Sequence, residues 1–418
     1  MQKVRQKKEK MRNVTVNDLF SLEAKRDPIR FYKQLREQGP IIDLGEYPSI
    51  GKFWLLTRYE DAIALLKDPH PFTRDRLKLL SPEEKEQTTR YHSALEQYVL
   101  QRRDMLAVDP PDHTRLRKLV AKAFTPRMIE QMRPRMQQIV DELINAVEDK
   151  GKIELISEFA YPLPITVICE MLGIPARDRQ QFRHWTQLLI VPPQKPEEFA
   201  ALNAPLEEFI SYIQRLIEEK HQNPGDDIIS VLVQAREQED KLSENELISS
   251  IFLLIVAGHE TTVNLIANGV LELLLHPDQL QLLQQDPSLL PSTIEELLRY
   301  TGPIFAAGSH WAMEDTTLYG KQIRKGDIVL VGLTAANLDP DVFEHPEKLD
   351  ITREENKHVA FGKGIHVCLG APLARQESQI AIGTLIRRLP HLRLAVPPEQ
   401  LVWSGSKFRA LRSLPLEF

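Results

Sequence analysis

The sequence has little cysteine, which excludes a fold held together by disulfides. Its 418 residues contain only two cysteines, Cys169 and Cys368. Two thiols suit a reducing compartment rather than the disulfide-rich scaffolds of small secreted domains. We therefore expect a cytoplasmic protein that is stabilised by a hydrophobic core. Cys169 lies inside the apolar run 165–172 and is expected to be an inert core residue.

Long hydrophobic runs are missing as well, which argues against a membrane-spanning segment. A membrane-crossing helix needs roughly 18 apolar residues in succession. The longest candidate here, Ile251–Ala257, has seven. The basic N-terminal stretch MQKVRQKKEKMR is followed by no apolar segment, so it does not resemble a secretory signal. We expect residues 1–25 to form a disordered basic tail, with a targeting or membrane-surface role as the alternative.

Neither sign of charge is in large excess. Lysine and arginine total 53 and the acidic residues 59, for a net charge of −6. This balance gives no reason to expect a nucleic-acid partner. Apolar residues make up 42% of the chain, which is ample for a sizeable core. The length would accommodate two or three ordinary domains or one large one.

Helical periodicity dominates the chain, and extended segments are few. Apolar spacing and helix-breaking residues predict helices at 28–38, 59–67, around 113–117, and at 128–147, 161–172, 178–190, 196–222, 243–275 and 292–300. Short strands are expected at 41–43, at 53–57 and within 304–331. The polar, weakly periodic segment 68–101 and the Val191-Pro192-Pro193 cluster are expected to be loops.

The stretch 361–370, FGKGIHVCLG, combines a cysteine with three glycines and leads directly into a helical run. A thiolate near a helix N-terminus is stabilised by unpaired amide groups and by the helix dipole. Glycine lets a large planar ligand approach the main chain. The sulfur of Cys368 is therefore expected to attack a substrate or to hold a metal.

The pattern F-G-x-G-x-H-x-C-x-G resembles the haem-binding loop of cytochromes P450, and the resemblance extends from about Asp27 to the C-terminus. It implies that Cys368 ligates the iron of haem b, that Phe361 packs near the sulfur, and that His366 addresses a haem propionate. Gly362 and Gly370 match the glycines of the loop. The implied fold is mainly α-helical with a small β-rich region, as one domain at 26–418.

The segment 257–262, AGHETT, lies in the middle of the helix predicted at 243–275. It resembles the distal helix of P450s, where Gly258 would make room for dioxygen. Cleaving dioxygen consumes protons, which Glu260 would relay from outside, while the Thr261 hydroxyl would orient the oxygen and a water molecule. We expect a distorted helix at this point. His259 as a second iron ligand is the less favoured alternative.

Three further residues resemble the P450 scaffold. Glu296 and Arg299 stand three residues apart in STIEELLRY. On a helix this spacing alone predicts a surface ion pair. In P450s the corresponding pair is buried and bonds to the segment that precedes the cysteine loop, here 344–357. Arg353 is the expected third member.

Two segments are expected to bind the haem propionates. His113 and Arg117 in DHTRLR share one helix face, and by resemblance they pair with these anions. In HWAMED, bacterial P450s usually have arginine where this chain has His310. Histidine titrates near neutrality and lacks the guanidinium fork. We expect His310 to donate one hydrogen bond instead.

The resemblance implies a monooxygenase that inserts one oxygen atom of O2 into a substrate. Electrons would come from NAD(P)H through a reductase and a ferredoxin or flavodoxin, since this chain contains no flavin or iron–sulfur motif. Basic side chains near the cysteine loop would attract such an acidic partner; the candidates are Lys118, Lys122, Arg127, Lys363 and Arg375. A peroxygenase that uses hydrogen peroxide and a non-catalytic haem-binding sensor are the alternatives. We expect a monomer.

The substrate is expected to be lipophilic. Residues predicted to line the pocket are apolar and mostly small, namely Val256, Ala257, Phe305, Ala306 and Ala307. The chain resembles soluble bacterial P450s that hydroxylate polyketides, macrolides, fatty acids or steroid-like molecules. The sequence leaves open which of these it takes, and whether the substrate arrives on a carrier protein.

Overall fold

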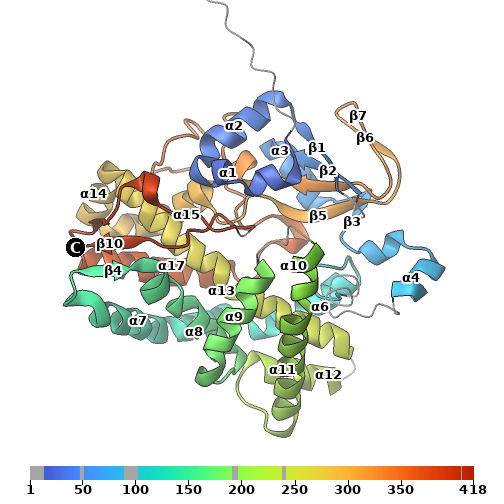
Figure 1. Cartoon of the computed structure of the whole chain (residues 1–418), viewed down its shortest axis with the longest axis horizontal. Coiled ribbons are helices and arrows are strands. Elements are labelled where there is room, and N and C mark those ends of the chain that lie inside the picture. Colours follow the sequence, from blue (N-terminus) through green and yellow to red (C-terminus); the bar gives the residue numbers. More distant parts are fainter. Residues whose placement is uncertain (1–13, 48–50, 89–101, 191–195, 238–241, 406) are drawn as a thin grey trace, which may run out of the picture.

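The computed structural model describes residues 14–47, 51–88, 102–190, 196–237, 242–405 and 407–418. Helices make up most of it, and strands β1, β2, β3 and β5 of one small sheet lie near the first helices of the chain (Figure 1). This confirms the predicted mainly α-helical fold with a β-rich region.

The first helices are α1 (Leu22–Arg26), α2 (Pro28–Gln38), α3 (Tyr59–Lys67), α4 (Pro82–Thr88), α6 (Asp112–Ala123), α7 (Pro126–Glu148) and α8 (Pro162–Leu172). They are followed by α9 (Arg179–Ile190), α10 (Pro196–Ala201), α11 (Asn203–Gln222), α12 (Ile228–Glu237), α13 (Glu244–Leu275), α14 (Pro277–Gln285), α15 (Leu290–Thr301), α16 (Leu333–Asn337) and α17 (Ala371–Arg388). The helix predicted at 196–222 is thus divided in two at Leu202.

Within the described ranges, ten strands form three sheets. Five strands pair in the order β1 (Ile41–Tyr47), β2 (Gly51–Leu56), β8 (Ile328–Val331), β5 (Ala307–Ala312) and β3 (Phe72–Thr73). A second sheet contains β4 (Lys152–Glu154), β10 (Pro415–Glu417) and β9 (Arg393–Leu394), and a hairpin joins β6 (Thr316–Leu318) to β7 (Lys321–Ile323). Only β2 and β8 pair in parallel within these described sheets.

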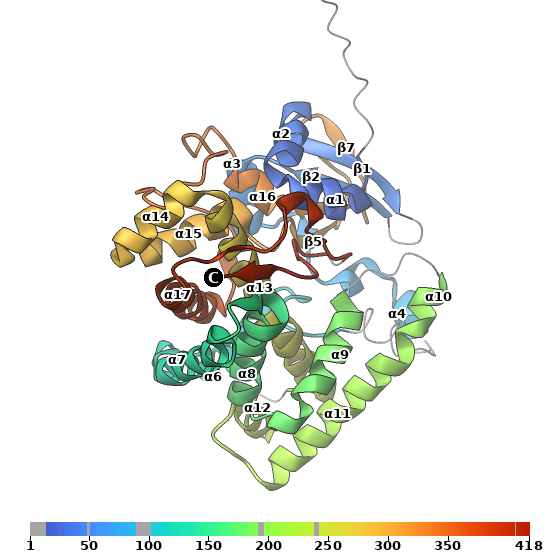
Figure 2. The ribbon, with the colours of Figure 1, turned by 60° about the vertical axis from the view of Figure 1, so that its left-hand side comes forward.

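Helix α13 passes through the middle of the helical part (Figure 2). Ser243 and Glu246 form a capping box at its start, and His276 followed by proline ends it. By length and composition α13 is able to cross a membrane, but 78% of its most apolar window is buried inside the protein. It packs against α8, α15 and α17 and is therefore the central core helix.

Two expectations about the N-terminal third need correction. Disorder was predicted through residue 25, yet a short 3-10 helix at Val16–Phe20 and α1 are formed, and Leu19 is fully buried. Residues 1–13 of the predicted tail lie outside the described residues. The predicted loop at 68–101 contains β3 and α4, while 89–101 and the predicted loop at 191–193 also fall outside them.

Candidate active site

The cysteine loop is a tightly bonded turn between the segment before it and α17. The Cys368 amide donates to the Phe361 carbonyl at 2.8 Å, and the Val367 amide donates to Gly364 at 3.2 Å. Gly364 has a φ of 67°, and a Cβ there would collide with the Leu66 carbonyl at the end of α3. Glycine is therefore required for the loop to lie against that helix.

Cys368 lies three residues before Ala371, where α17 begins. Desolvation raises the pKa of the thiol, and the amide groups of Gly370 and Ala371 together with Arg117 and Arg375 oppose that rise. The Cys368 side chain is nevertheless exposed. Dense protein surroundings combined with one accessible side suit a thiolate that is held by a metal ion rather than a free nucleophile.

Behind the loop, Arg375 and His358 converge on one carboxylate. Arg375 donates to both oxygens of Glu295 at 2.6 and 2.8 Å, and His358 Nε2 lies 3.0 Å from the same group. Burial would raise the pKa of Glu295, but Arg375 and His358 outweigh it and lower the pKa to about 2. The Arg375 guanidinium also lies 4.7 Å from the Phe361 ring centre. Arg375 is thus paired, whereas Lys118, Lys122, Arg127 and Lys363 form no ion pair within the described part of the chain.

Glu296, Arg299 and Arg353 form a second group, here called the scaffold cluster. Both side chains of the Glu296–Arg299 pair are fully buried, with N–O distances of 2.7 and 2.8 Å. Arg353 Nε donates to Glu296 at 3.2 Å, and Asn356 donates to the same carboxylate at 3.0 Å. Arg299 also donates to the carbonyl groups of Asn337, Pro346 and Lys348. The cluster therefore ties α15 to the segment before the cysteine loop.

On the other side of the loop, cationic and imidazole side chains gather from four distant segments. This group, here called the donor cluster, consists of Arg74, His113, Arg117, His310 and His366. The rings of His113 and His366 lie edge to face at 4.4 Å, and Arg117 donates to the Val367 carbonyl at 2.7 Å. His310 is buried on β5 with Nδ1 3.3 Å from the Val329 carbonyl.

Several buried nitrogen atoms in the donor cluster have no hydrogen-bond partner among the described residues. They are both ring nitrogens of His113, Nδ1 of His366 and Nε of Arg74. Buried polar groups are almost always paired, so unpaired donors facing one another indicate a missing anionic ligand. The two carboxylates of haem, with the iron at Cys368, fit this donor set.

Helix α13 presents a different surface at the segment expected to handle protons. The Thr261 hydroxyl donates to the Ala257 carbonyl at 3.1 Å, and α13 is one uninterrupted α-helix. The expected distortion is therefore wrong, because the hydroxyl bonds back to its own helix without opening it. A Cβ at Gly258 would meet Ile168 Cγ1 at 2.8 Å, so glycine allows close packing against α8. Space for dioxygen at Gly258 stays a prediction.

His259 points away from Thr261. It is fully buried, with Nδ1 2.9 Å from the Ile255 carbonyl and Nε2 3.3 Å from Thr186 Oγ1. Glu260 lies beside it, with 3.6 Å between the carboxylate and His259 Nε2. The ring is thus occupied by protein contacts, which agrees with the expectation that His259 is not an iron ligand.

The predicted substrate-pocket residues divide between two places. Val256 and Ala257 lie on α13, and Val256 packs against Phe408 and Ala410 from the C-terminal segment. Phe305 instead packs 5.7 Å from the ring of Tyr32 in the N-terminal core. Its ring therefore contacts the N-terminal core, and its place in a substrate pocket stays a prediction.

Ala306 and Ala307 are partly buried at the edges of two different apolar clusters. Ala306 packs against the N-terminal core around Leu19 and Phe305, and Ala307 packs against the core of the five-stranded sheet. Their place in a substrate pocket stays a prediction. Ile304 also packs against Phe408, so the apolar wall continues from α13 to the residues before β5.

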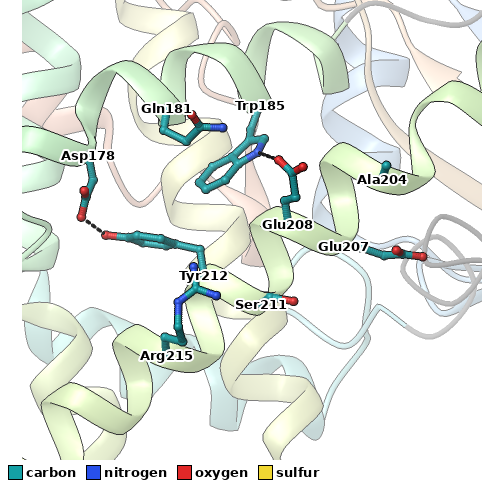
Figure 3. A pocket seen from close by; sticks show the side chains of 9 residues that line it. All are labelled: Asp178, Gln181, Trp185, Ala204, Glu207, Glu208, Ser211, Tyr212 and Arg215. Atoms are coloured by element: carbon teal, nitrogen blue, oxygen red, sulfur yellow. Dashed lines mark hydrogen bonds between the residues drawn. The ribbon is translucent and has the colours of Figure 1, made fainter.

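A surface pocket of about 600 Å³ lies between α9 and α11 (Figure 3). Trp185 donates to Glu208 at 3.3 Å across it, and Tyr212 donates to Asp178 at 2.7 Å. None of its lining residues belongs to the donor cluster or the cysteine loop. This pocket is therefore separate from the candidate active site.

Sequence reasoning missed Arg74, Glu377 and Phe408. Glu377 on α17 is buried without a hydrogen-bond partner among the described residues, and burial raises its pKa to about 8. An acidic residue on the apolar face of a predicted helix was a signal for it. Arg74 and Phe408 lie in short irregular segments without periodicity, so no local pattern marked them.

Comparisons with known proteins agree with this geometry. The family model for cytochrome P450 matches residues 49–403. Cytochrome P450 CYP107DY1 of Priestia megaterium is 53% identical over 98% of this chain and all of its own length. The polyketide biosynthesis cytochrome P450 PksS of Bacillus subtilis is 43% identical over 93% of this chain and 95% of its own.

A solved structure gives the same result for the fold. Myxobacterial cytochrome P450 CYP267B1 in complex with myristic acid superimposes with a TM-score of 0.87 at 42% identity, covering 97% of this chain and 99% of its own. A match of this extent, in sequence and in fold, includes the cysteine loop, the scaffold cluster and α13. The chain belongs to the cytochrome P450 family of monooxygenases, which implies a haem iron cofactor.

Proposed function

We propose that this protein is a haem-thiolate monooxygenase that inserts one atom of O2 into a lipophilic polyketide, macrolide, fatty-acyl or steroid-like substrate. The observation that supports it best is that an accessible Cys368 side chain lies next to the donor cluster, whose buried nitrogens have no partner among the described residues. Bound haem, ligated by a thiolate, supplies the chemistry of O–O bond cleavage. The chain's own residues anchor it, control protons and bind the substrate.

Cys368 holds the iron, and its loop fixes the sulfur in place. The amide of Cys368 is bonded to Phe361, and Arg375 holds the Phe361 ring from the other side. Amide groups at the start of α17 point towards the sulfur and stabilise its anionic form. Gly362 and Gly370 belong to the same loop, whose turn keeps bulky side chains from the ligand.

Thr261 and Glu260 handle protons on α13. The Thr261 hydroxyl hydrogen is given to the Ala257 carbonyl, so its oxygen remains free to accept a hydrogen bond from water. Glu260 is buried beside His259, which is in turn close to Thr186. This row of polar groups leads from α13 towards α9 and supplies a path by which Glu260 exchanges its proton.

The substrate binds against an apolar wall. Phe408 and Ala410 near the C-terminus form this wall together with Val256 on α13 and Ile304, and Ala257 stands next to Val256 on the same helix. Apolar walls with few polar groups select lipophilic ligands. One relative is named for polyketide biosynthesis, and another was solved in complex with myristic acid. Both names support a lipophilic substrate for this chain.

Electrons come from NAD(P)H through a reductase and a small ferredoxin or flavodoxin. Lys118, Lys122, Arg127 and Lys363 are exposed and form no ion pair among the described residues. Arg117 on the same helix as Lys118 bonds to the cysteine loop, so these cations lie beside the iron ligand. An acidic partner that docks there would lie next to the loop that carries Cys368.

Turnover with labelled oxygen tests this function. Purified protein would be incubated with NADPH, a ferredoxin and its reductase, 18O2, and a panel of fatty acids and macrolactones that shift the absorption spectrum. A product with one labelled oxygen atom is expected, and Thr261→Ala is expected to consume NADPH without forming it. A peroxygenase would be favoured if hydrogen peroxide alone supported product formation and if Thr261→Ala formed the product as fast as wild type. Haem binding without any product in either case would favour a sensor.

A further inference from the structure

Arg74 occupies a position that the sequence patterns did not single out. It follows β3 directly, and its side chain reaches across to β5. A Cβ built at Gly308 would collide with the Arg74 guanidinium. Gly308 has a φ of 57° and lies where the pairing of β5 with β8 slips, between Ala307 and His310. The irregular strand thus leaves room for a guanidinium directly before His310.

The Arg74 guanidinium has no anion of its own among the described residues. Its Nε is buried and unpaired, and its side chain forms no hydrogen bond or ion pair there. The nearest carboxylate, Asp109, is bonded to Lys78 at 2.7 Å and to the Thr73 hydroxyl. Asp109 accepts from Arg74 only through the backbone amide, at 2.9 Å. A buried unpaired guanidinium is costly, so a ligand is expected to compensate it.

Two histidines near Arg74 do not supply charge. Burial, followed by the charge of Arg74, lowers the pKa of His310 to about 3. Burial and Arg117 lower the pKa of His113 as well. Both of these rings are therefore neutral near pH 7. Arg117 already donates to the Val367 carbonyl.

His310 is also committed to its own sheet. Its Nδ1 faces the Val329 carbonyl at 3.3 Å, and the Gly308 carbonyl is a second backbone acceptor for the ring. A neutral imidazole carries one N–H, so an Nδ1–H that donates to Val329 leaves Nε2 as an acceptor only. Such a ring cannot donate to a carboxylate. A residue other than His310 is therefore the better donor for the hydrogen bond that was expected from His310 to a haem propionate.

We propose that Arg74 binds a haem carboxylate and replaces the arginine that the related enzymes carry at the position of His310. This inference rests on the proposed function, since it requires haem. The cation reaches the ligand from β3 instead of from β5, through the gap at Gly308. His113 and His366 then supply further hydrogen bonds beside it, from ring nitrogens that have no partner among the described residues.

Haem loss to excess apomyoglobin tests the proposal without measuring turnover. Wild type, Arg74→Ser, Arg74→Lys, Arg76→Ser and the double variant Arg74→Ser/His310→Arg would be compared as holoproteins. Arg76 is the matched control, because it lies two residues away and packs over Trp311 at 5.3 Å. Arg74→Ser is expected to lose haem about tenfold to a hundredfold faster, the effect of one charge-assisted hydrogen bond. Arg76→Ser should match wild type, and the double variant should recover part of the retention.

Reconstitution with haem dimethyl ester isolates the carboxylate. With this ligand, wild type and Arg74→Ser are expected to lose haem at the same rate. A difference that persists with the ester, or equal rates for Arg74→Ser and Arg76→Ser with natural haem, would overturn the proposal. If Arg74→Ser keeps too little haem to purify, Arg74→Lys replaces it in the comparison. Its rate of haem loss is expected to lie between that of wild type with natural haem and that of wild type with the ester. A wild type that binds no thiolate-ligated haem would instead overturn the proposed function itself.

Discussion

The scaffold cluster and the donor cluster both place arginine side chains near the cysteine loop, but their hydrogen bonding differs. In the scaffold cluster, Arg299 donates five hydrogen bonds and both oxygens of Glu296 accept from several donors. In the donor cluster, buried nitrogens of Arg74, His113 and His366 have no partner among the described residues. Saturated charges hold a fold together, whereas unsaturated ones reveal where a ligand binds.

Breaking the scaffold cluster should have the largest effect. Arg299→Ala leaves the Glu296 carboxylate buried without its main partner, which typically costs about 3–5 kcal/mol of unfolding free energy. Urea unfolding of the haem-free protein measures it. The control is Arg388→Ala, whose pair with Glu148 is partly exposed and should cost less than about 1 kcal/mol. Equal losses in both variants would contradict a scaffolding role.

Glu377 is a buried acid without a hydrogen-bond partner among the described residues, and it can be compared with the unpaired nitrogens of the donor cluster. Burial raises its pKa from 4.5 to about 8, so the folded protein keeps it protonated near neutrality. Its contribution to stability is complete below pH 4.5 and is lost as pH rises towards 8, by about 3 kcal/mol at pH 7. Glu377→Gln should therefore flatten the fall in melting temperature from pH 5 to 8. The exposed control Glu399→Gln should keep the wild-type slope, and a Glu377→Gln slope equal to it would refute the assignment.

Acid titration tests the saturated pair behind the cysteine. The pKa of Glu295 is lowered to about 2, so its contribution is present above pH 4.5 and is lost as pH falls towards 2. Because Arg375 is 36% exposed, solvent screening reduces this contribution to roughly 1 kcal/mol. Glu295→Gln should be less stable than wild type at pH 6 and nearly equal to it at pH 2, as followed by circular dichroism. A constant difference across this range would show that the loss is steric.

Reversing exposed cations should have the smallest effect, on association alone. Lys118→Glu/Lys122→Glu is expected to slow binding of an acidic ferredoxin about tenfold at low ionic strength and little above 0.5 M salt. The rate at saturating ferredoxin should not change. Stopped-flow reduction measures both quantities, with Lys33→Glu on α2 as the exposed control. A defect that is independent of salt would exclude steering by these lysines.

Contiguous patterns predicted the architecture and much of the site. The glycines and cysteine at 361–370 and the three-residue spacing of Glu296 and Arg299 are local features, so sequence alone placed them. The capping box at Ser243 likewise located the start of α13. Such features depend on neighbours within one or two turns, which the sequence displays directly.

Features made by distant segments were not predictable in this way. The direction of Phe305 depends on how its segment packs against α2, and Arg74 reaches its position only because β3 pairs with β5. The sequence predicted that Gly258 makes room for dioxygen. The contact that requires a glycine there in this structure is with Ile168, which comes from α8. In each case the decisive contact joins residues far apart in the chain, and no periodicity encodes it.

The absorption spectrum of the reduced protein with carbon monoxide tests the central claim most directly. Thiolate ligation by Cys368 predicts a strongly red-shifted Soret band in the wild type and its loss in Cys368→Ala. A band at the position of globins would mean that the iron has no thiolate ligand and would contradict the proposed oxygenase mechanism. Absence of any haem band would contradict the assignment of the donor cluster as a haem-carboxylate site.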